Sequence, residues 1–170
     1  MNITAISKKP FLLIVALGLT LTAFTQNTPY KATHEGWLVS IDEAFALSKK
    51  TGKPIMANFT GSDWCGWCKR LSAAVFLQPD FKKWADKNVV LLELDFPRGI
   101  KIPDAIRAQN QSLQQAFNVS GYPTIWVFDL DKEKGTGQFS IRALGKTGYV
   151  PTVQEFTSGV DQMIAKRVKV

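Results

Sequence analysis

The chain has 170 residues, of which 45% are hydrophobic and 21% are charged, and its formal net charge is +7. This length supports one domain with an ordinary hydrophobic core, and the composition is that of a globular rather than a disordered protein. The lysines and arginines are spread along the chain and are not interleaved with aromatic side chains on one face. The pattern therefore excludes a nucleic-acid-binding platform, and we expect no nucleic-acid partner.

The first 25 residues have the pattern of a secretory signal peptide. Lys8 and Lys9 form a positive region, and residues 11–24 form an apolar region. This run is shorter than the roughly 20 apolar residues that a transmembrane helix needs. Thr25 makes the cleavage site imperfect, because it is larger than the usual small residue there. We predict a cleaved signal peptide over residues 1–25 and a periplasmic or secreted protein, with an uncleaved anchor as the alternative.

Residues 26–36 are polar and contain Pro29, which predicts a short linker before a domain spanning residues 37–170. His34, the only histidine of the chain, lies in this linker. It is either a metal ligand or base, or an exposed linker residue. The second interpretation is favoured, because nothing nearby in the sequence fixes its side chain.

The first predicted elements are a helix and a buried strand. Ser40 and Glu43 form a capping box, which starts a helix that ends at Gly52 and Pro54. Residues 55–60 are apolar without alternation, as in a strand covered on both faces. The later elements are, in order, a turn over 60–63, a helix over about 65–76, a short helix around 81–85, a strand over 89–95, a loop over 96–103, a helix capped by Asn110, a strand over 124–129, a turn over 131–137, a strand over 138–144 and a helix capped near Thr152.

This order of elements predicts an α/β fold. Strands separated by helices indicate a parallel portion with right-handed crossovers, and the terminal hairpin adds an antiparallel edge. The predicted architecture is a central mixed sheet with helices on both faces.

Both cysteines, Cys65 and Cys68, lie at the predicted junction between a strand, a turn and a helix. The unpaired N–H groups and the dipole of the helix N-terminus favour an anion, so the pKa of the first thiol falls. A thiolate is the attacking species in disulfide exchange. We therefore predict that Cys65 is the nucleophile and that Cys68, one turn further on and deeper, resolves the mixed disulfide.

Two alternatives to a redox pair are weaker. A structural zinc site needs four ligands, whereas this chain offers two cysteines and the remote His34. A purely structural disulfide over so short a loop removes little chain entropy, and exported proteins that depend on disulfides usually carry more of them. We predict a redox-active disulfide with no metal and no bound cofactor.

The sequence from Trp64 to Lys69, Trp-Cys-Gly-Trp-Cys-Lys, resembles the thioredoxin superfamily. More narrowly, the sequence from Gly61 to Leu71, with Phe76 and Pro79 after it, is similar to a branch of exported bacterial thioredoxin-like proteins. That branch includes the C-terminal domain of the transmembrane thiol–disulfide interchange protein. Residues 121–129 match the cis-proline loop of the superfamily and the strand after it. The resemblance runs from about residue 37 to the C-terminus and implies a thioredoxin-like fold.

The resemblance also implies a substrate-binding surface around the thiols. Pro123 is expected to be cis, and the backbone of Tyr122 is expected to pair with an extended substrate. Trp64 and Gly66 flank Cys65, and Trp64 is expected to shield one side of it. Trp67 either grips a peptide substrate or packs into the core, and its place in a tight turn favours exposure.

One departure from the superfamily concerns proton transfer. Thioredoxins carry a buried aspartate on the first strand, which helps to deprotonate the resolving thiol. The matching position here is Asn58, which does not take up a proton at neutral pH. Glu93 and Asp95 are near in strand order, so proton transfer at Cys68 is expected to be slower or to be carried by water or another carboxylate.

Two functions of different classes remain. The first is an exported thiol–disulfide oxidoreductase acting on protein disulfides, and the second is a non-catalytic thioredoxin-like binding module. Within the first, we expect a monomeric reductase kept reduced by a membrane electron donor, with an isomerase or oxidase as the alternative. The reductase is favoured because the residues between the cysteines, Gly66 and Trp67, supply no cation to stabilise a thiolate.

Overall fold

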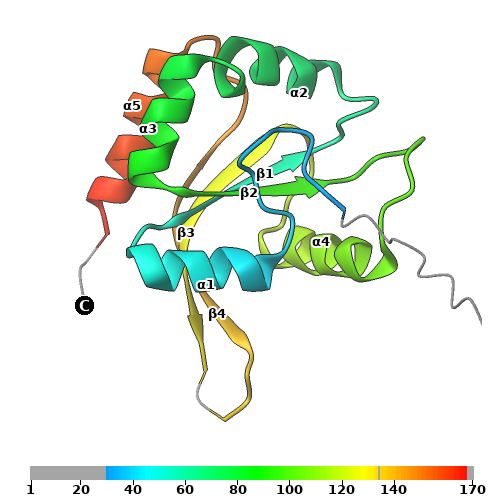
Figure 1. Ribbon diagram of the computed structural model, residues 1–170, viewed down its shortest axis with the longest axis vertical. Coiled ribbons are helices and arrows are strands. Elements are labelled where there is room, and N and C mark those ends of the chain that lie inside the picture. The colour runs from blue at the N-terminus through cyan, green and yellow to red at the C-terminus, as the bar shows by residue number, and fades with distance from the viewer. Residues whose placement is uncertain (1–29, 134, 168–170) are drawn as a thin grey trace, which may run out of the picture.

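The computed structural model of the protein describes residues 30–133 and 135–167 (Figure 1). The predicted signal peptide and the start of the predicted linker lie outside these residues. The elements in chain order are α1 (Ile41–Thr51), β1 (Ile55–Thr60), α2 (Gly66–Leu71), the π-helix η1 (Ser72–Phe76), α3 (Pro79–Asn88), β2 (Val90–Asp95), α4 (Asp104–Ala116), β3 (Thr124–Lys132), β4 (Phe139–Thr147) and α5 (Val153–Ala165). In the part of the chain described, no helix has the length and apolar character needed to cross a membrane.

The strands form one mixed sheet, as predicted, and their order in it is β2-β1-β3-β4. Strands β1 and β2 are parallel, with Ile55 opposite Val90 and Thr60 opposite Asp95. Strand β3 runs antiparallel to both β1 and β4, so the parallel portion consists of β1 and β2 alone. The carboxyl ends of β1 and β2 therefore meet at one edge of the sheet, where the cysteine-containing turn begins.

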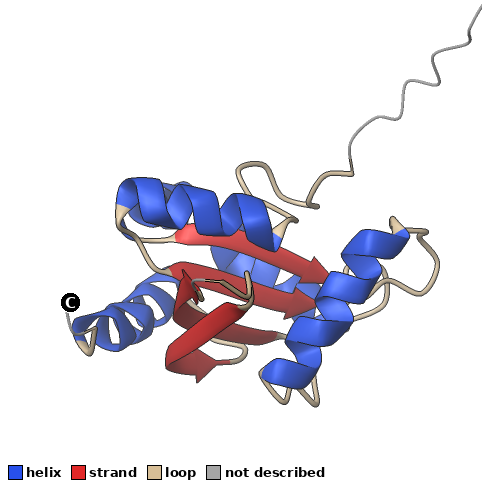
Figure 2. Cartoon of the chain, turned by 90° about the horizontal axis from the view of Figure 1, so that it is seen from below, coloured by secondary structure: helices blue, strands red, loops and turns tan. Residues whose placement is uncertain are grey.

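Helices cover both faces of the sheet, which confirms the predicted architecture (Figure 2). Helices α1 and α4 pack on one face, around Phe59 and Leu92. Helices α2, α3 and α5 and the π-helix pack on the other, around Phe76, Phe81 and Phe156. Every residue of β1 is buried, as expected from its apolar sequence without alternation.

The helix caps follow the sequence pattern. The Ser40 hydroxyl accepts the Glu43 N–H at 3.4 Å, and the Thr152 hydroxyl accepts the Glu155 N–H at 3.3 Å. Helix α1 ends at Gly52 with φ of 70°, a left-handed conformation that glycine adopts without steric cost. These caps fix the ends of α1 and the start of α5.

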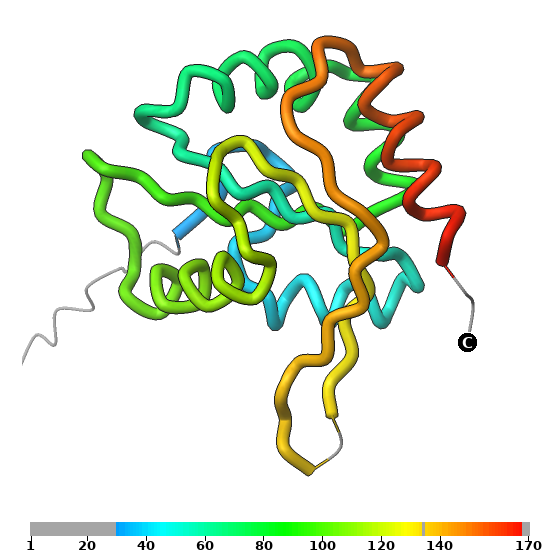
Figure 3. Tube along the Cα trace, turned by 180° about the vertical axis from the view of Figure 1, so that it is seen from behind, coloured from blue at the N-terminus to red at the C-terminus, as the bar shows by residue number. Residues whose placement is uncertain are grey.

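Two predicted boundaries are wrong. Asn110 does not cap a helix: α4 begins at Asp104, with Pro103 at the N-cap position and no side-chain cap among the described residues. Asn110 is instead buried in the middle of α4 and donates to the Asp95 carbonyl at 2.9 Å. The terminal hairpin is also longer than predicted, since β3 and β4 pair from Ile125 opposite Thr147 out to Lys132 opposite Phe139 (Figure 3).

Candidate active site

The two cysteines form a disulfide at the start of α2, with a sulfur–sulfur distance of 2.08 Å. Cys65 occupies the N-cap position, and its sulfur accepts the backbone N–H of Cys68 at 3.1 Å. Both residues are 6% exposed, so the prediction that Cys68 lies deeper is wrong. What separates the two cysteines is position: Cys65 precedes the helix, and Cys68 belongs to its first turn.

The ring of Trp64 is held against the turn before the disulfide. Its indole N–H donates to the Phe96 carbonyl at 2.9 Å, and the Arg98 guanidinium lies 4.0 Å from the ring centroid. The ring covers Gly61 so closely that a Cβ there would lie 2.5 Å from a ring atom. Glycine is therefore required at position 61 for Trp64 to adopt this orientation.

Asp63 ties the active-site turn to the loop after β2. Its carboxylate accepts the N–H of Gly99 at 2.6 Å and the N–H of Arg98 at 3.0 Å. These hydrogen bonds, that of Gly99 first, lower the pKa of Asp63 below its ordinary value. The ammonium group of Lys69 donates to the Asp63 carbonyl at 2.8 Å, which adds a contact from α2.

Trp67 lies between the cysteines and is 53% exposed, as its place in a tight turn predicted. Its ring packs edge-on against Tyr149, with centroids 5.0 Å apart, and the Arg70 guanidinium lies 4.7 Å from its centroid. Gly66 beside it has open space where a side chain would extend. The disulfide is thus bordered on this side by an exposed aromatic pair.

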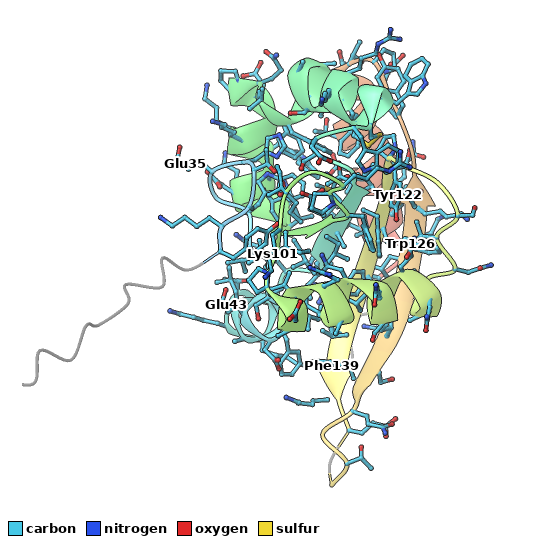
Figure 4. The ribbon with its side chains drawn as sticks, turned by 90° about the vertical axis from the view of Figure 1, so that its right-hand side faces the viewer. Glu35, Glu43, Lys101, Tyr122, Trp126 and Phe139 are labelled. Atoms are coloured by element: carbon cyan, nitrogen blue, oxygen red, sulfur yellow. A yellow bond between two sulfur atoms is a disulfide. The ribbon has the colours of Figure 1, made fainter. Side chains whose placement is uncertain are left out.

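The loop before β3 borders the opposite side of the turn. The peptide bond between Tyr122 and Pro123 is cis, as the resemblance implied. The Tyr122 ring is edge-on to Trp64 at 5.8 Å, and its hydroxyl accepts a hydrogen bond from Gln114 at 2.6 Å (Figure 4). Burial, and secondarily the charge of Asp95, raises the pKa of Tyr122. The residues predicted to bind substrate therefore gather around one disulfide.

Beneath α2 the sheet carries buried polar side chains instead of apolar ones. Asn58 lies opposite Glu93 in the parallel register, and Thr60 lies opposite Asp95. Asp95 accepts the N–H of Ser62 at 2.8 Å and its hydroxyl at 2.5 Å, yet burial raises the pKa of Asp95. Two buried carboxylates of β2, Glu93 and Asp95, thus lie beside the strand on which thioredoxins carry their aspartate.

His34 lies in this polar layer, so its assignment as an exposed linker residue is wrong. Its side chain is 12% exposed, with Nδ1 3.0 Å from a Glu93 carboxylate oxygen and Nε2 2.5 Å from the Ser72 hydroxyl. The other Glu93 oxygen accepts the Thr33 N–H at 2.7 Å. Trp37, 7% exposed, anchors the segment, which Figure 3 shows in blue beside the sheet. A tryptophan three residues after the histidine was the sequence signal for this packing.

A pocket of about 140 Å³ joins these groups to the disulfide. It is lined by Cys68 together with His34, Ser72 and Glu93. Sequence reasoning did not single out Ser72. Over residues 30–133 and 135–167, no group of three or more histidine, cysteine or acidic side chains is arranged to hold a metal ion.

Comparison with known proteins agrees with this geometry. The family model of the thioredoxin-like domain matches residues 41–162. The disulfide bond reductase DsbH of Chlamydia pneumoniae is 33% identical over 129 residues, which are 76% of each chain. The thiol:disulfide interchange protein DsbD of Shigella boydii is 35% identical over 117 residues, which are 67% of this chain but 18% of DsbD.

Solved structures show the same fold. The structure of a DsbH oxidoreductase superposes with a TM-score of 0.65 at 29% identity, over 85% of this chain and 94% of the other. A thioredoxin from Thermus thermophilus superposes with a TM-score of 0.55 at 21% identity, over 74% of this chain and 85% of its own. With the family model spanning most of the fold and the disulfide at the start of α2, the chain belongs to the thioredoxin-like family and is a thiol–disulfide oxidoreductase.

Proposed function

We propose that the protein is an exported disulfide reductase that acts on disulfides of other proteins. The observation that carries this proposal is the Cys65–Cys68 disulfide at the start of α2, bordered by exposed aromatic side chains. The similarity to a protein named disulfide bond reductase, over three quarters of both chains, supports the same activity.

The reaction begins from the reduced enzyme. The Cys65 thiolate attacks one sulfur of the substrate disulfide, which forms a mixed disulfide and releases the other sulfur as a thiolate that takes a proton. Cys68 then loses its proton and attacks the Cys65 sulfur, which releases the second substrate thiol and closes the Cys65–Cys68 disulfide. Two electrons pass from the enzyme to the substrate. The N–H of Cys68, which points at the Cys65 sulfur, supports the assignment of Cys65 as nucleophile.

The surface around the disulfide suits an extended polypeptide. Trp64, Trp67 and the backbone of Gly66 supply one side of the proposed binding site, and Tyr122 and Pro123 supply the other. Aromatic rings give a large contact area with few rotatable bonds, and an extended chain adds backbone hydrogen bonds. The two arginines stacked on the tryptophans favour substrates with acidic residues near the cysteine.

Export and electron supply complete the proposal. Residues 1–25 act as a cleaved signal peptide, the segment up to residue 36 leads into the domain of residues 37–170, and a membrane protein returns electrons to the disulfide. The enzyme acts as a monomer in the periplasm or outside the cell. N-terminal sequencing of the exported protein should begin within a few residues of Gln26, and a start at Met1 would contradict export by cleavage.

The deciding experiment is reduction of insulin by the mature protein with dithiothreitol as electron source. We expect turnover by the wild type and none by Cys65→Ser, with Leu47→Ala on α1 as an exposed control that keeps full activity. A protein that binds unfolded clients equally well with both cysteines replaced, and does not reduce insulin, would be a binding module instead.

A further inference from the structure

Three side chains form a hydrogen-bonded row behind the disulfide. The Ser72 hydroxyl lies 2.5 Å from His34 Nε2, and His34 Nδ1 lies 3.0 Å from Glu93. A carboxylate only accepts hydrogen bonds, so the neutral imidazole carries its proton on Nδ1, and Nε2 is left as the acceptor of the Ser72 hydroxyl. A hydroxyl, an imidazole and a carboxylate in this order make the imidazole a base that the acid orients.

This row faces the thiol that must lose a proton. Ser72 opens the π-helix four residues after Cys68, and its backbone N–H donates to the Cys68 carbonyl as in a helical turn, so the two side chains project from the same face. Cys68, Ser72, His34 and Glu93 line the same pocket, whose volume of about 140 Å³ has room for water molecules. Cys68 and the hydrogen-bonded row therefore share one pocket.

The buried aspartate that thioredoxins carry on the first strand is replaced by an amide in this chain. Asn58, within β1, is 3% exposed, and its side-chain oxygen has no hydrogen-bond partner among the described residues. An amide does not take up a proton at neutral pH, so Asn58 does not serve as the base. Glu93, its neighbour across the strands, is 1% exposed and is engaged by Thr33 and His34.

We propose that His34, oriented by Glu93, is the base that takes the proton of the resolving thiol Cys68. The inference rests on the proposed thiol–disulfide exchange. In the mixed disulfide, the Cys68 S–H bond breaks as its proton passes to His34, the new sulfur–sulfur bond forms to Cys65, and the old bond to the substrate sulfur breaks. The released substrate thiolate then takes this proton from His34, or takes one from water while His34 returns its own to the solvent. His34 ends each cycle unchanged.

Other charged groups surround this histidine. Lys69 lines the same pocket, Asp95 lies two residues from Glu93 on β2, and Glu35 is the exposed chain neighbour of His34. The pKa of Tyr30 is raised to about 12 by burial and then by the charges of Asp95 and Glu93, so its hydroxyl stays protonated in the working pH range. Among these groups only His34 has a ring nitrogen within hydrogen-bonding distance of the Ser72 hydroxyl.

The test uses the reduced full-length mature protein and 5,5′-dithiobis(2-nitrobenzoate) in a stopped-flow instrument. Attack by Cys65 releases one nitrothiobenzoate, and attack by Cys68 releases a second, so the two steps give separate phases. At pH 7 we expect His34→Ala and Glu93→Gln to slow the second phase at least about tenfold and to leave the first within twofold. Glu35→Gln, on the outer side of the same segment (Figure 4), is the matched control and should change neither phase.

Two further readouts separate proton transfer from a structural role. Imidazole added to His34→Ala should accelerate the second phase, and the rate of that phase should rise about tenfold per pH unit below about pH 8.5, more steeply than in the wild type. A second phase within twofold of the wild type, or a slow one that imidazole does not accelerate, would overturn the assignment. If His34→Ala also loses the first phase, the substitution has disrupted the site. The rate of the second phase in Glu93→Gln then decides the assignment. Because the probe is a small disulfide, failure of the wild type on insulin would count against the proposed function alone.

Discussion

Glu93 lies directly opposite Asn58 across the parallel strands β1 and β2, and both side chains are buried beneath α2. Residues paired in a parallel register project to the same face of a sheet. Glu93 is paired with His34 from a segment 59 residues earlier in the chain, whereas the Asn58 oxygen has no partner among the residues described. The buried carboxylate of this site therefore comes from β2, and the segment before α1 supplies His34, which pairs with it.

Trp37 is expected to hold that segment in place. Its ring packs 5.0 Å from Phe76 and 6.4 Å from Phe81, measured between centroids. Truncating a buried tryptophan removes its transfer free energy and leaves a cavity, so Trp37→Ala should lower the free energy of unfolding by about 3–5 kcal/mol. Urea unfolding of the oxidised protein measures this. Leu47→Ala, 39% exposed on α1, should change stability by less than about 0.5 kcal/mol.

The two cysteines should differ in acidity and in the intermediates they leave. Cys65 caps α2, where the helix N-terminus favours a thiolate, so its thiol should have the lower pKa. We expect Cys68→Ser to accumulate mixed disulfides with insulin chains and Cys65→Ser to form none. Alkylation of the reduced protein at mildly acidic pH, followed by peptide mapping, checks the order. Faster modification of Cys68 would reverse the two roles.

The sequence predicted the fold and the disulfide because those features depend on local signals. The apolar run of β1, the caps of α1 and α5 and the spacing of Cys65 and Cys68 each lie within a few residues. The place of His34 depends instead on a contact with Glu93, and Asn110 of helix α4 is buried through a hydrogen bond to the Asp95 carbonyl of β2. Neither long-range pairing leaves a periodic pattern in the sequence, so both side chains were misplaced.

The Asp63 carboxylate should make the active-site turn sensitive to acid. Its pKa is lowered by the N–H groups of Gly99 and Arg98, so its stabilising contribution is present above the ordinary value of 3.8. That contribution is lost as the pH falls through the lower pKa of the folded state. Asp63→Ala should therefore be less stable than the wild type at pH 7, and the difference should shrink as the pH falls below 3.8. A difference in unfolding free energy that is constant with pH would show that the charge is not responsible.

Trp67 should matter for polypeptide substrates and not for small ones. Its ring is 53% exposed beside the disulfide, and truncating an aromatic contact residue of this kind commonly costs about 1–2 kcal/mol of binding. We expect Trp67→Ala to raise the KM for insulin about 5- to 30-fold while the rate with 5,5′-dithiobis(2-nitrobenzoate) stays within twofold. An equal loss with both substrates would instead indicate a disturbed disulfide.

The reduction potential of the Cys65–Cys68 pair should lie nearer about −270 mV than about −120 mV. A strongly oxidising pair needs a reduced form in which the nucleophilic thiolate is held firmly. Here no cation lies between the cysteines, and the nearest lysine in sequence, Lys69, donates to the Asp63 carbonyl. The helix terminus alone contributes about 0.3–1 kcal/mol when exposed.

That contribution is far too small to make the pair an oxidant. A span of about 150 mV corresponds to roughly 7 kcal/mol for a two-electron couple. Equilibrating the protein with glutathione buffers and measuring the reduced fraction gives the potential. Trp67→His places a cation between the cysteines and should move the potential to a less negative value, because it stabilises the Cys65 thiolate. A wild-type potential near the oxidising end would exclude a reductase and leave the exchange chemistry of the two thiols intact.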